Sequence, residues 1–122
     1  PSLDPKWWAP YTGYTLAKMG MSFVTLGLAA EFADRGIAIN ALWPRTLIAT
    51  DALNMIPGVS TTNARRPEIV ADAAHAILVR PAAGFTGRFL VDDEVLAEAG
   101  VTDLSRYAVD PARPLLPDLF LD

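Results

Sequence analysis

Apolar residues recur at three- and four-residue steps over residues 11–35, as on one face of an amphipathic helix. We expect the buried stripe of this helix to be Leu16, Met19, Phe23, Leu26 and Ala30. Gly36 follows and suits the left-handed residue that ends many helices. Residues 1–10 hold three prolines, so they are predicted to form an irregular approach loop.

Two short apolar stretches, residues 37–43 and 84–91, are predicted strands. The first is nearly all apolar, which is typical of a strand buried on both faces of a parallel sheet. Residues 44–66 between them read as a long irregular segment with a short helix near residues 51–55. Loops of this length inside a compact domain are usually lids or binding loops.

A second helix is predicted from Pro67 to about Val79, with a buried face of Val70, Ala74, Ile77 and Leu78. Residues 92–98 form a short helix or helical turn closed by Gly100. The tail after Val101 carries prolines among leucines. It cannot be regular, yet it is too apolar to be free in water, so we expect residues 110–122 to dock on protein across a subunit boundary.

Helices and strands alternate along the chain, which favours the α/β fold class. Two strands are too few for a parallel sheet covered on both faces. We therefore interpret residues 1–122 as the C-terminal portion of a single α/β domain, and we expect the N-terminal half of that domain to lie upstream, absent from this chain.

Composition narrows the possible functions. Apolar residues make up 52% and charged residues 20%, which is unlike a disordered tail. The net charge of −4 without a basic stripe disfavours nucleic-acid binding. With no cysteine and one histidine, we expect no metal site and no cysteine nucleophile. No membrane span and no signal-peptide pattern are found, so we expect a cytoplasmic protein.

Tyr14 and Lys18 lie four residues apart on the first predicted helix, which places them one turn from each other on one face. A lysine ammonium beside a phenol lowers the tyrosine pKa from its usual value of about 10. Such a tyrosine can exchange a proton with a carbonyl or hydroxyl oxygen near neutral pH. Taken alone, the spacing favours an exposed tyrosine that packs on an aliphatic lysine stem, and only the surrounding sequence reverses this preference.

The surrounding sequence resembles the short-chain dehydrogenase/reductase family, from its active-site helix to its C-terminus. The motifs are Tyr14 with Lys18, the strand ending Asn-Ala-Leu-Trp-Pro (40–44), and the threonine-containing loop that follows. The resemblance implies a Rossmann-type doubly wound parallel sheet, with Tyr14 as general acid/base and Lys18 as the residue that lowers its pKa and holds the ribose of NAD or NADP. It also implies cofactor contacts by Pro44, Arg45, Thr46, Ile48 and Thr50.

Two positions depart from the family pattern: Arg45 stands where the family has glycine, and Thr50 lies one residue further out. Ile48 then takes the place whose backbone meets the nicotinamide carboxamide. One subgroup, with lipid- or steroid-like substrates implied, carries a basic residue at the glycine position and the same threonine spacing. Its motifs recur in order in residues 14–22, 40–46, 85–93 and 117–122.

Other expected parts of the family site are not found in the chain. Ser2 stands twelve residues before Tyr14, but we interpret it as a loop residue and expect the catalytic serine upstream of Pro1. No glycine-rich strand-to-helix turn occurs, so activity is expected to require the N-terminal half of the domain.

Several further residues leave alternatives open. Gly13, Gly20 and Gly27 recur every seven residues and suit close packing, either within the subunit or in a homo-oligomer (dimer or tetramer). Arg65 and Arg66 are interpreted as a solvated pair rather than a phosphate contact. The acidic run 92–94 resembles half a metal site, but a helix N-terminus explains it without a metal. His75 is expected on the surface or at an interface.

These expectations combine into one hypothesis and one rival. The hypothesis is an NAD(P)-dependent oxidoreductase that interconverts a secondary alcohol and a ketone, or an aldehyde, on a small apolar substrate. The rival is a non-catalytic dinucleotide-binding or scaffold protein that keeps the fold.

Overall fold

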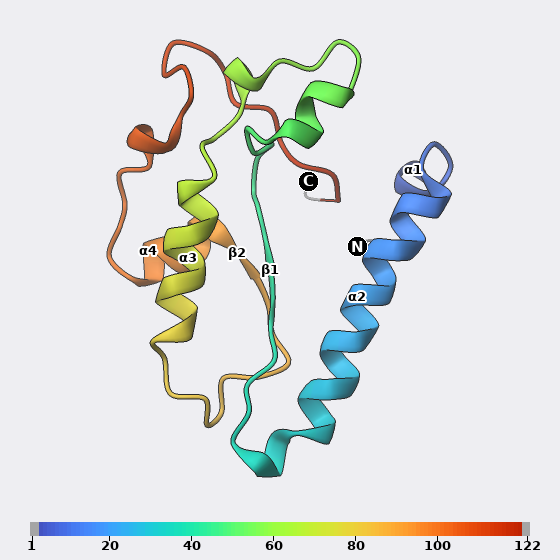
Figure 1. Ribbon diagram of the computed structural model, residues 1–122, viewed down its shortest axis with the longest axis vertical. Coiled ribbons are helices and arrows are strands. Elements are labelled where there is room, and N and C mark those ends of the chain that lie inside the picture. Colours follow the sequence, from blue (N-terminus) through green and yellow to red (C-terminus); the bar gives the residue numbers. More distant parts are fainter. Residues whose placement is uncertain (1–2, 121–122) are drawn as a thin grey trace. The chain divides into compact units, whose positions relative to one another are not determined.

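The computed structural model describes residues 3–120 and divides the chain into two compact units (Figure 1). The first unit contains the described residues up to Ala41 together with Pro81–Phe89. The second contains Leu42–Arg80 and the described residues from Leu90 onward. Ser2 lies outside the described residues, and the single-domain interpretation stays a prediction.

The first unit begins with a helical turn that the sequence interpretation missed. Helix α1 (Pro5–Trp8) forms where an irregular loop was predicted. Pro5 occupies the first turn, where its missing N–H costs nothing. The Asp4 carboxylate accepts a hydrogen bond from the Lys6 N–H at 2.9 Å and so caps the turn.

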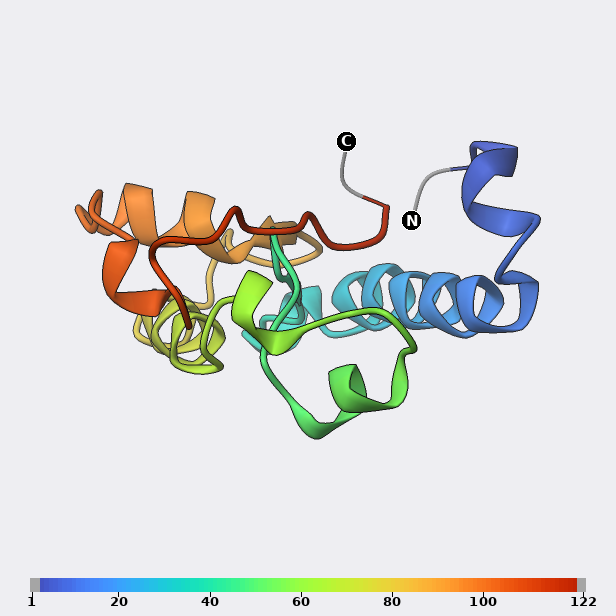
Figure 2. The ribbon, with the colours of Figure 1, turned by 90° about the horizontal axis from the view of Figure 1, so that it is seen from above.

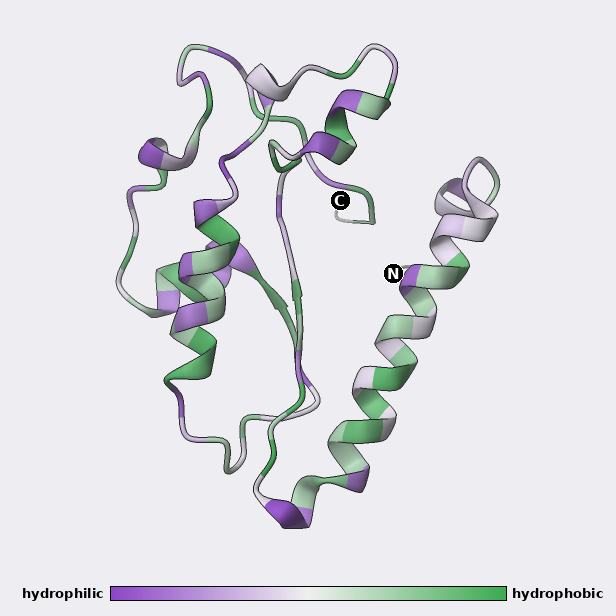
Figure 3. Cartoon of the chain, viewed as in Figure 1, coloured by the Kyte–Doolittle hydropathy of each residue, from purple (hydrophilic) through white to green (hydrophobic). Residues whose placement is uncertain are grey.

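Helix α2 (Thr12–Glu31) is present as predicted, but it buries a different face. Its buried residues are Thr15, Met19, Ser22, Thr25 and Ala29. The hydroxyl groups among them bond to the backbone, Thr25 to the Met21 carbonyl at 3.0 Å, for example, so their burial leaves no polar group unpaired. Of the predicted stripe only Met19 is buried, and Leu16 and Phe23 are 63% and 65% exposed. Hydrophobic residues recur along the whole helix (Figure 3).

The helix ends in a short 3-10 turn, η1 (Ala33–Arg35), and Gly36 takes the predicted left-handed conformation with φ 69°. Asn40 then fastens the chain to the segment before the second strand. Its side-chain amide donates to the Phe85 carbonyl at 2.9 Å, and its side-chain oxygen accepts from the Arg88 N–H at 2.9 Å.

Strands β1 (Ala41–Trp43) and β2 (Phe89–Val91) pair in a two-stranded parallel sheet. Both are shorter than the predicted strands. The prediction that the first strand is buried on both faces is wrong for this chain, since each of its three residues is half-buried. With only two strands in the described sheet, much of the surface of these strands is not covered by other elements.

The core of the second unit lies between helices α3 (Glu68–Leu78) and α4 (Asp92–Glu98). It consists of Ile69, Ala73, Val95, Leu96 and Tyr107. The predicted face of α3 is therefore wrong by about one residue: Val70 and Ile77 only flank the core, and Leu78 is 81% exposed. Gly100, with φ 85°, follows α4 as predicted.

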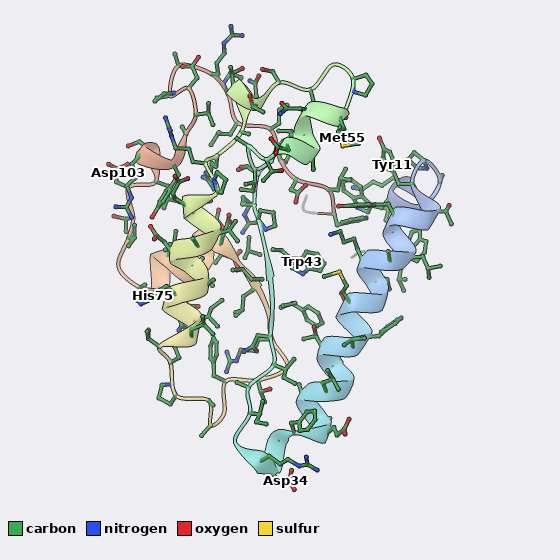
Figure 4. All side chains as sticks on the ribbon, in the orientation of Figure 1. Tyr11, Asp34, Trp43, Met55, His75 and Asp103 are labelled. Carbon is green, nitrogen blue, oxygen red and sulfur yellow. The ribbon has the colours of Figure 1, made fainter. Side chains whose placement is uncertain are left out.

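The rest of the second unit is irregular backbone with three 3-10 turns, η2 (Asp51–Met55), η3 (Thr61–Asn63) and η4 (Ser105–Tyr107). The first confirms the predicted short helix, and its Met55 is labelled in Figure 4. Within residues 3–120, no helix has the length and apolar character that crossing a membrane requires.

Candidate active site

The structure brings Tyr14 and Lys18 together on α2. The Lys18 Nζ atom lies 5.3 Å from the centroid of the Tyr14 ring. Tyr14 is 49% exposed, so a molecule approaching this face of the helix can reach it. The ammonium group therefore lies over the face of the Tyr14 ring, within the range of a cation–π interaction. The two side chains are neighbours on the helix, as the four-residue spacing predicted. Their catalytic roles stay a prediction.

Helix α1 fixes the first turn of α2, on which Tyr14 lies. The Thr12 hydroxyl donates to the Trp8 carbonyl at 2.8 Å. The hydroxyl of Thr15, which is fully buried, donates to the Trp7 carbonyl at 3.0 Å. Tyr11 occupies the N-cap position of α2 without a side-chain capping bond and is 51% exposed (Figure 4). The prolines and threonines at this corner thus give Tyr14 a defined position.

The predicted cofactor-contacting loop, residues 44–50, lies in the second unit and runs between two distant segments. The Leu47 N–H donates to the Leu116 carbonyl at 3.0 Å, and the Arg45 carbonyl accepts from the Asp118 N–H at 3.1 Å. On its other side, the Ala49 N–H donates to the Arg65 carbonyl at 2.8 Å. Figure 2 shows the C-terminal tail, in red, running beside this loop. The loop is irregular but firmly bonded.

Two N–H groups of the loop, those of Thr46 and Ile48, donate to no described residue. The N–H groups on both sides of Ile48, those of Leu47 and Ala49, are hydrogen-bonded. The Ile48 side chain packs against the core of the second unit. Its carbonyl accepts from the Thr50 N–H at 2.8 Å. Among the described residues, the N–H at the position to which the resemblance assigns the nicotinamide carboxamide therefore has no acceptor.

Arg45 directs its side chain to the first turn of α4. The guanidinium Nε lies 3.2 and 3.1 Å from the two carboxylate oxygens of Asp93, and its Nη2 bonds Glu94. The hydrogen bond to Asp93 is the main reason why the pKa of Arg45 is raised. The Arg45 backbone therefore lies in the predicted loop, while its guanidinium group binds carboxylates in the first turn of α4.

Asp92 is fully buried beneath the same loop. Its Oδ1 atom accepts from the Arg45 N–H at 2.9 Å and from the Asp93 N–H at 2.8 Å. Burial raises the pKa of this carboxyl, although the two N–H groups oppose the shift. In the described part of the chain, no group of three or more histidine, cysteine or acidic side chains could hold a metal ion. The acidic run begins α4, as the helix interpretation expected.

The remaining predicted residues are placed as follows. Thr46 is buried and its backbone pairs with Pro117, while Pro44 is half-buried and Thr50 exposed. Arg65 is not the solvated residue that the sequence suggested: its side chain is only 12% exposed, and its Nη1 lies 4.0 Å from the Asp93 carboxylate. His75 is exposed on α3 (Figure 4).

Sequence reasoning missed the contacts that hold the loop. Asp93 was considered only as a helix-terminal charge, and the tail was expected to dock without a known partner. The sequence did contain a signal for the contact between Arg45 and Asp93. A basic residue follows the first predicted strand and acidic residues follow the second, and these positions come together when the two strands are parallel neighbours.

Comparison with solved structures gives the class of protein that this chain resembles. "Crystal structure of a putative dehydrogenase from Xanthomonas campestris" matches all of the chain with 74% identity and a TM-score of 0.96, over 45% of that protein. A short-chain dehydrogenase from Mycobacterium thermoresistibile matches all of it with 45% identity and a TM-score of 0.88, over 44% of that protein. The α/β class and the resemblance to short-chain dehydrogenases are confirmed.

The resemblance extends to one particular kind of dehydrogenase. Hydroxysteroid dehydrogenase-like protein 2 from Danio rerio is 50% identical over 122 residues, and the same protein from Homo sapiens is 45% identical over 123 residues. Each match covers 99% of this chain but only 29% of the relative. No family model matches the chain.

Proposed function

We propose that this chain is part of a short-chain dehydrogenase, an NAD(P)-dependent oxidoreductase that interconverts a secondary alcohol and a ketone, or an aldehyde. The observation that carries the proposal is the Tyr14–Lys18 pair, with the Lys18 ammonium 5.3 Å from the ring centroid, in a chain so similar to dehydrogenases. The proposal includes a Rossmann-type doubly wound sheet, of which this chain supplies the C-terminal half.

In this proposal Tyr14 carries the proton. Its hydroxyl gives a proton to the substrate oxygen during reduction and takes one back during oxidation. Lys18 stabilises the phenolate through its charge and binds the cofactor ribose. Because both groups lie on one turn of one helix, their separation does not depend on any other part of the chain.

The loop residues fit a nicotinamide cofactor in one testable respect. The Ile48 N–H donates to none of the described residues, and a carboxamide oxygen is a suitable acceptor for it. Pro44, Arg45, Thr46 and Thr50 shape the backbone around that donor. When bound, the nicotinamide supplies or accepts the hydride. The choice between NAD and NADP is assigned to residues outside this chain.

The substrate is proposed to be small and apolar, lipid- or steroid-like. Met55 is 82% exposed and Ile56 49% exposed at the end of η2, in the long segment that follows the loop. Exposed apolar side chains in such a segment suit an apolar ligand better than a charged one.

We also propose that the natural protein is a homo-oligomer, a dimer or tetramer, that uses α2. Leu16, Phe23 and Leu26 are exposed on this helix, and a Cβ added at Gly13, Gly20 or Gly27 would meet no described atom within 4 Å other than its chain neighbours and the helix's own nearby backbone. Glycine at these positions is therefore not required by packing within the described residues. A second copy that packs on this face would use both features.

The test is turnover by the natural protein with NADH and NADPH, offered with a panel of apolar ketones and aldehydes. We expect reduction with one of the two cofactors and a matching alcohol product. Lys18→Met should weaken cofactor binding and move the pH optimum of alcohol oxidation upward, because the Tyr14 pKa is no longer lowered.

Lys6→Met provides the matched control, since Lys6 also lies over an aromatic ring, 5.0 Å from the Trp7 centroid, and has no assigned role. Tight cofactor binding without turnover of any substrate, together with Lys18→Met having no effect on binding, would favour the non-catalytic scaffold.

A further inference from the structure

Arg45 is held at three points, by its backbone N–H, its backbone carbonyl and its guanidinium group. The N–H donates to Asp92 at 2.9 Å, and the carbonyl accepts from Asp118 at 3.1 Å. The guanidinium contacts both Asp93 oxygens at 3.1–3.2 Å and also Glu94. In the family pattern given above this position is glycine, which would keep the two backbone bonds and lose the third attachment.

The partners of the guanidinium are placed by the sheet. Strands β1 and β2 are parallel neighbours, so the residues that follow them meet at one edge. Arg45 comes two residues after β1, and α4 begins directly after β2 at Asp92. A long basic side chain at position 45 therefore reaches the first turn of α4 without any change in the backbone.

Asp93 carries most of this contact. The Asp93 side chain is 22% exposed and that of Arg45 is 32% exposed, so solvent screens their attraction only partly. The Glu94 side chain is 64% exposed, and its pair with Arg45 is correspondingly weaker. The Arg65 Nη1 atom lies 4.0 Å from an Asp93 carboxylate oxygen, so a second positive charge faces the same carboxylate.

We propose that Arg45 is a positioning residue: its guanidinium fastens the loop of residues 44–50 to Asp93 and so holds the Ile48 N–H where the cofactor meets it. The effect on cofactor binding rests on the proposed function. The attachment of the loop to Asp93 does not. The attachment raises the fraction of molecules whose loop is ready to bind. When the attachment is lost, the fraction of molecules with a binding-ready loop falls, and the apparent affinity for the cofactor falls in proportion. The proton transfer by Tyr14 on α2 is unchanged.

The first measurement needs no cofactor. In the natural protein, hydrogen exchange of the Leu47 and Ala49 N–H groups reports loop opening, since both are bonded when the loop is closed. Arg45→Met keeps the length of the side chain and removes its charge, and it should speed this exchange by about 3–10-fold. Asp93→Asn should do the same, and the double variant should add little to either single variant.

Arg80→Met is the matched control. Arg80 pairs with Glu98 at 3.0 Å, which joins the segment after α3 to the last turn of α4, at the opposite end of that helix from the Asp93 that Arg45 contacts. We expect this variant to leave the exchange at Leu47 and Ala49 unchanged. If Arg45→Met does not fold, Asp93→Asn carries the measurement alone. Unchanged loop exchange in the folded variants would overturn the proposal.

The second measurement is cofactor affinity. Arg45→Met should raise the cofactor Kd by about 3–10-fold, with kcat within about twofold of the natural value. Arg45→Lys should restore part of the affinity, because an ammonium can still contact Asp93. Faster exchange with an unchanged Kd would refute the positioning role. A natural protein that neither binds nor uses NAD(P) refutes the proposed function instead, and hydrogen exchange still decides whether Arg45 fastens the loop.

Discussion

Helix α2 and the loop of residues 44–50 carry the residues predicted to act, and the two are stabilised in opposite ways. The helix satisfies its own backbone and leaves Leu16 and Phe23 more than half exposed. The loop has no regular structure, yet its backbone bonds reach Arg65, Leu116 and Asp118. A segment of this molecule can therefore be held in place by backbone hydrogen bonds without having regular secondary structure. Changes on α2 should alter chemistry or association, whereas changes far along the chain should alter the loop.

The largest effect is expected from Tyr14→Phe. The hydroxyl group is removed while the ring stays beside Lys18, so proton transfer is lost and the helix is kept. We expect kcat to fall by about 10²–10⁴-fold, with cofactor affinity nearly unchanged, in steady-state assays of the natural protein. Tyr11→Phe, three residues earlier and equally exposed, is the control. A Tyr14→Phe protein with natural rates would show that Tyr14 is not the acid/base.

The next effect concerns the exposed face of α2. Phe23→Glu places a charge among apolar side chains that we propose a second copy covers. A symmetric interface contains the change twice, so association should weaken by roughly a hundredfold, as measured by sedimentation. Leu78→Glu on α3 changes a residue that is 81% exposed and should leave the oligomer intact. The same sedimentation behaviour in both variants would place the interface elsewhere.

A smaller effect is expected from deleting residues 111–122. The deletion removes the bonds from Leu116 to Leu47 and Asn63, and from Asp118 to Arg45. At about 1 kcal/mol for each bond, the melting temperature should fall by roughly 5–10 °C. An unchanged melting temperature after the deletion would contradict docking of the tail.

The smallest effect should come from Asp92→Asn. Burial raises the pKa of Asp92 in the folded state. The carboxyl therefore favours folding most below its unfolded pKa of about 3.9, and this contribution is lost as the pH rises through the folded-state pKa. Asparagine keeps an oxygen that can accept from Arg45 and does not titrate. Relative to the natural protein, the melting temperature of the variant should therefore improve between pH 4 and pH 7. A difference independent of pH would show that Asp92 does not titrate differently on folding.

How far the sequence predicted the molecule differs between the same two regions. Apart from the missed helix α1, the order of helices and strands, the Tyr14–Lys18 turn, Gly36 and α4 followed from periodicity and turn residues, which are local. The buried faces of α2 and α3 did not, because burial depends on what packs against a helix. On α2, Thr15 and Thr25 are buried through bonds that no hydrophobic pattern reveals.

The candidate site divides in the same way. Four-residue spacing on a helix is sufficient to predict that Tyr14 and Lys18 are neighbours. The attachment of Arg45 to Asp93 joins residues 48 positions apart, and the pairing of Thr46 with Pro117 joins residues still further apart. Such contacts follow only once the strand order is known. The tail was rightly expected to dock, and the part described docks within the second unit. A contact across a subunit boundary stays a prediction.

The bonds between the loop and the tail also set an order of events during synthesis. Arg45 leaves the ribosome about 70 residues before Asp118, which at roughly 5–20 residues per second is several seconds. Throughout that interval α2 can already be complete, because helices need only local contacts. A nascent chain thus carries the Tyr14–Lys18 pair well before it can close the loop, and a chain that stops short of Leu116 cannot complete this closure.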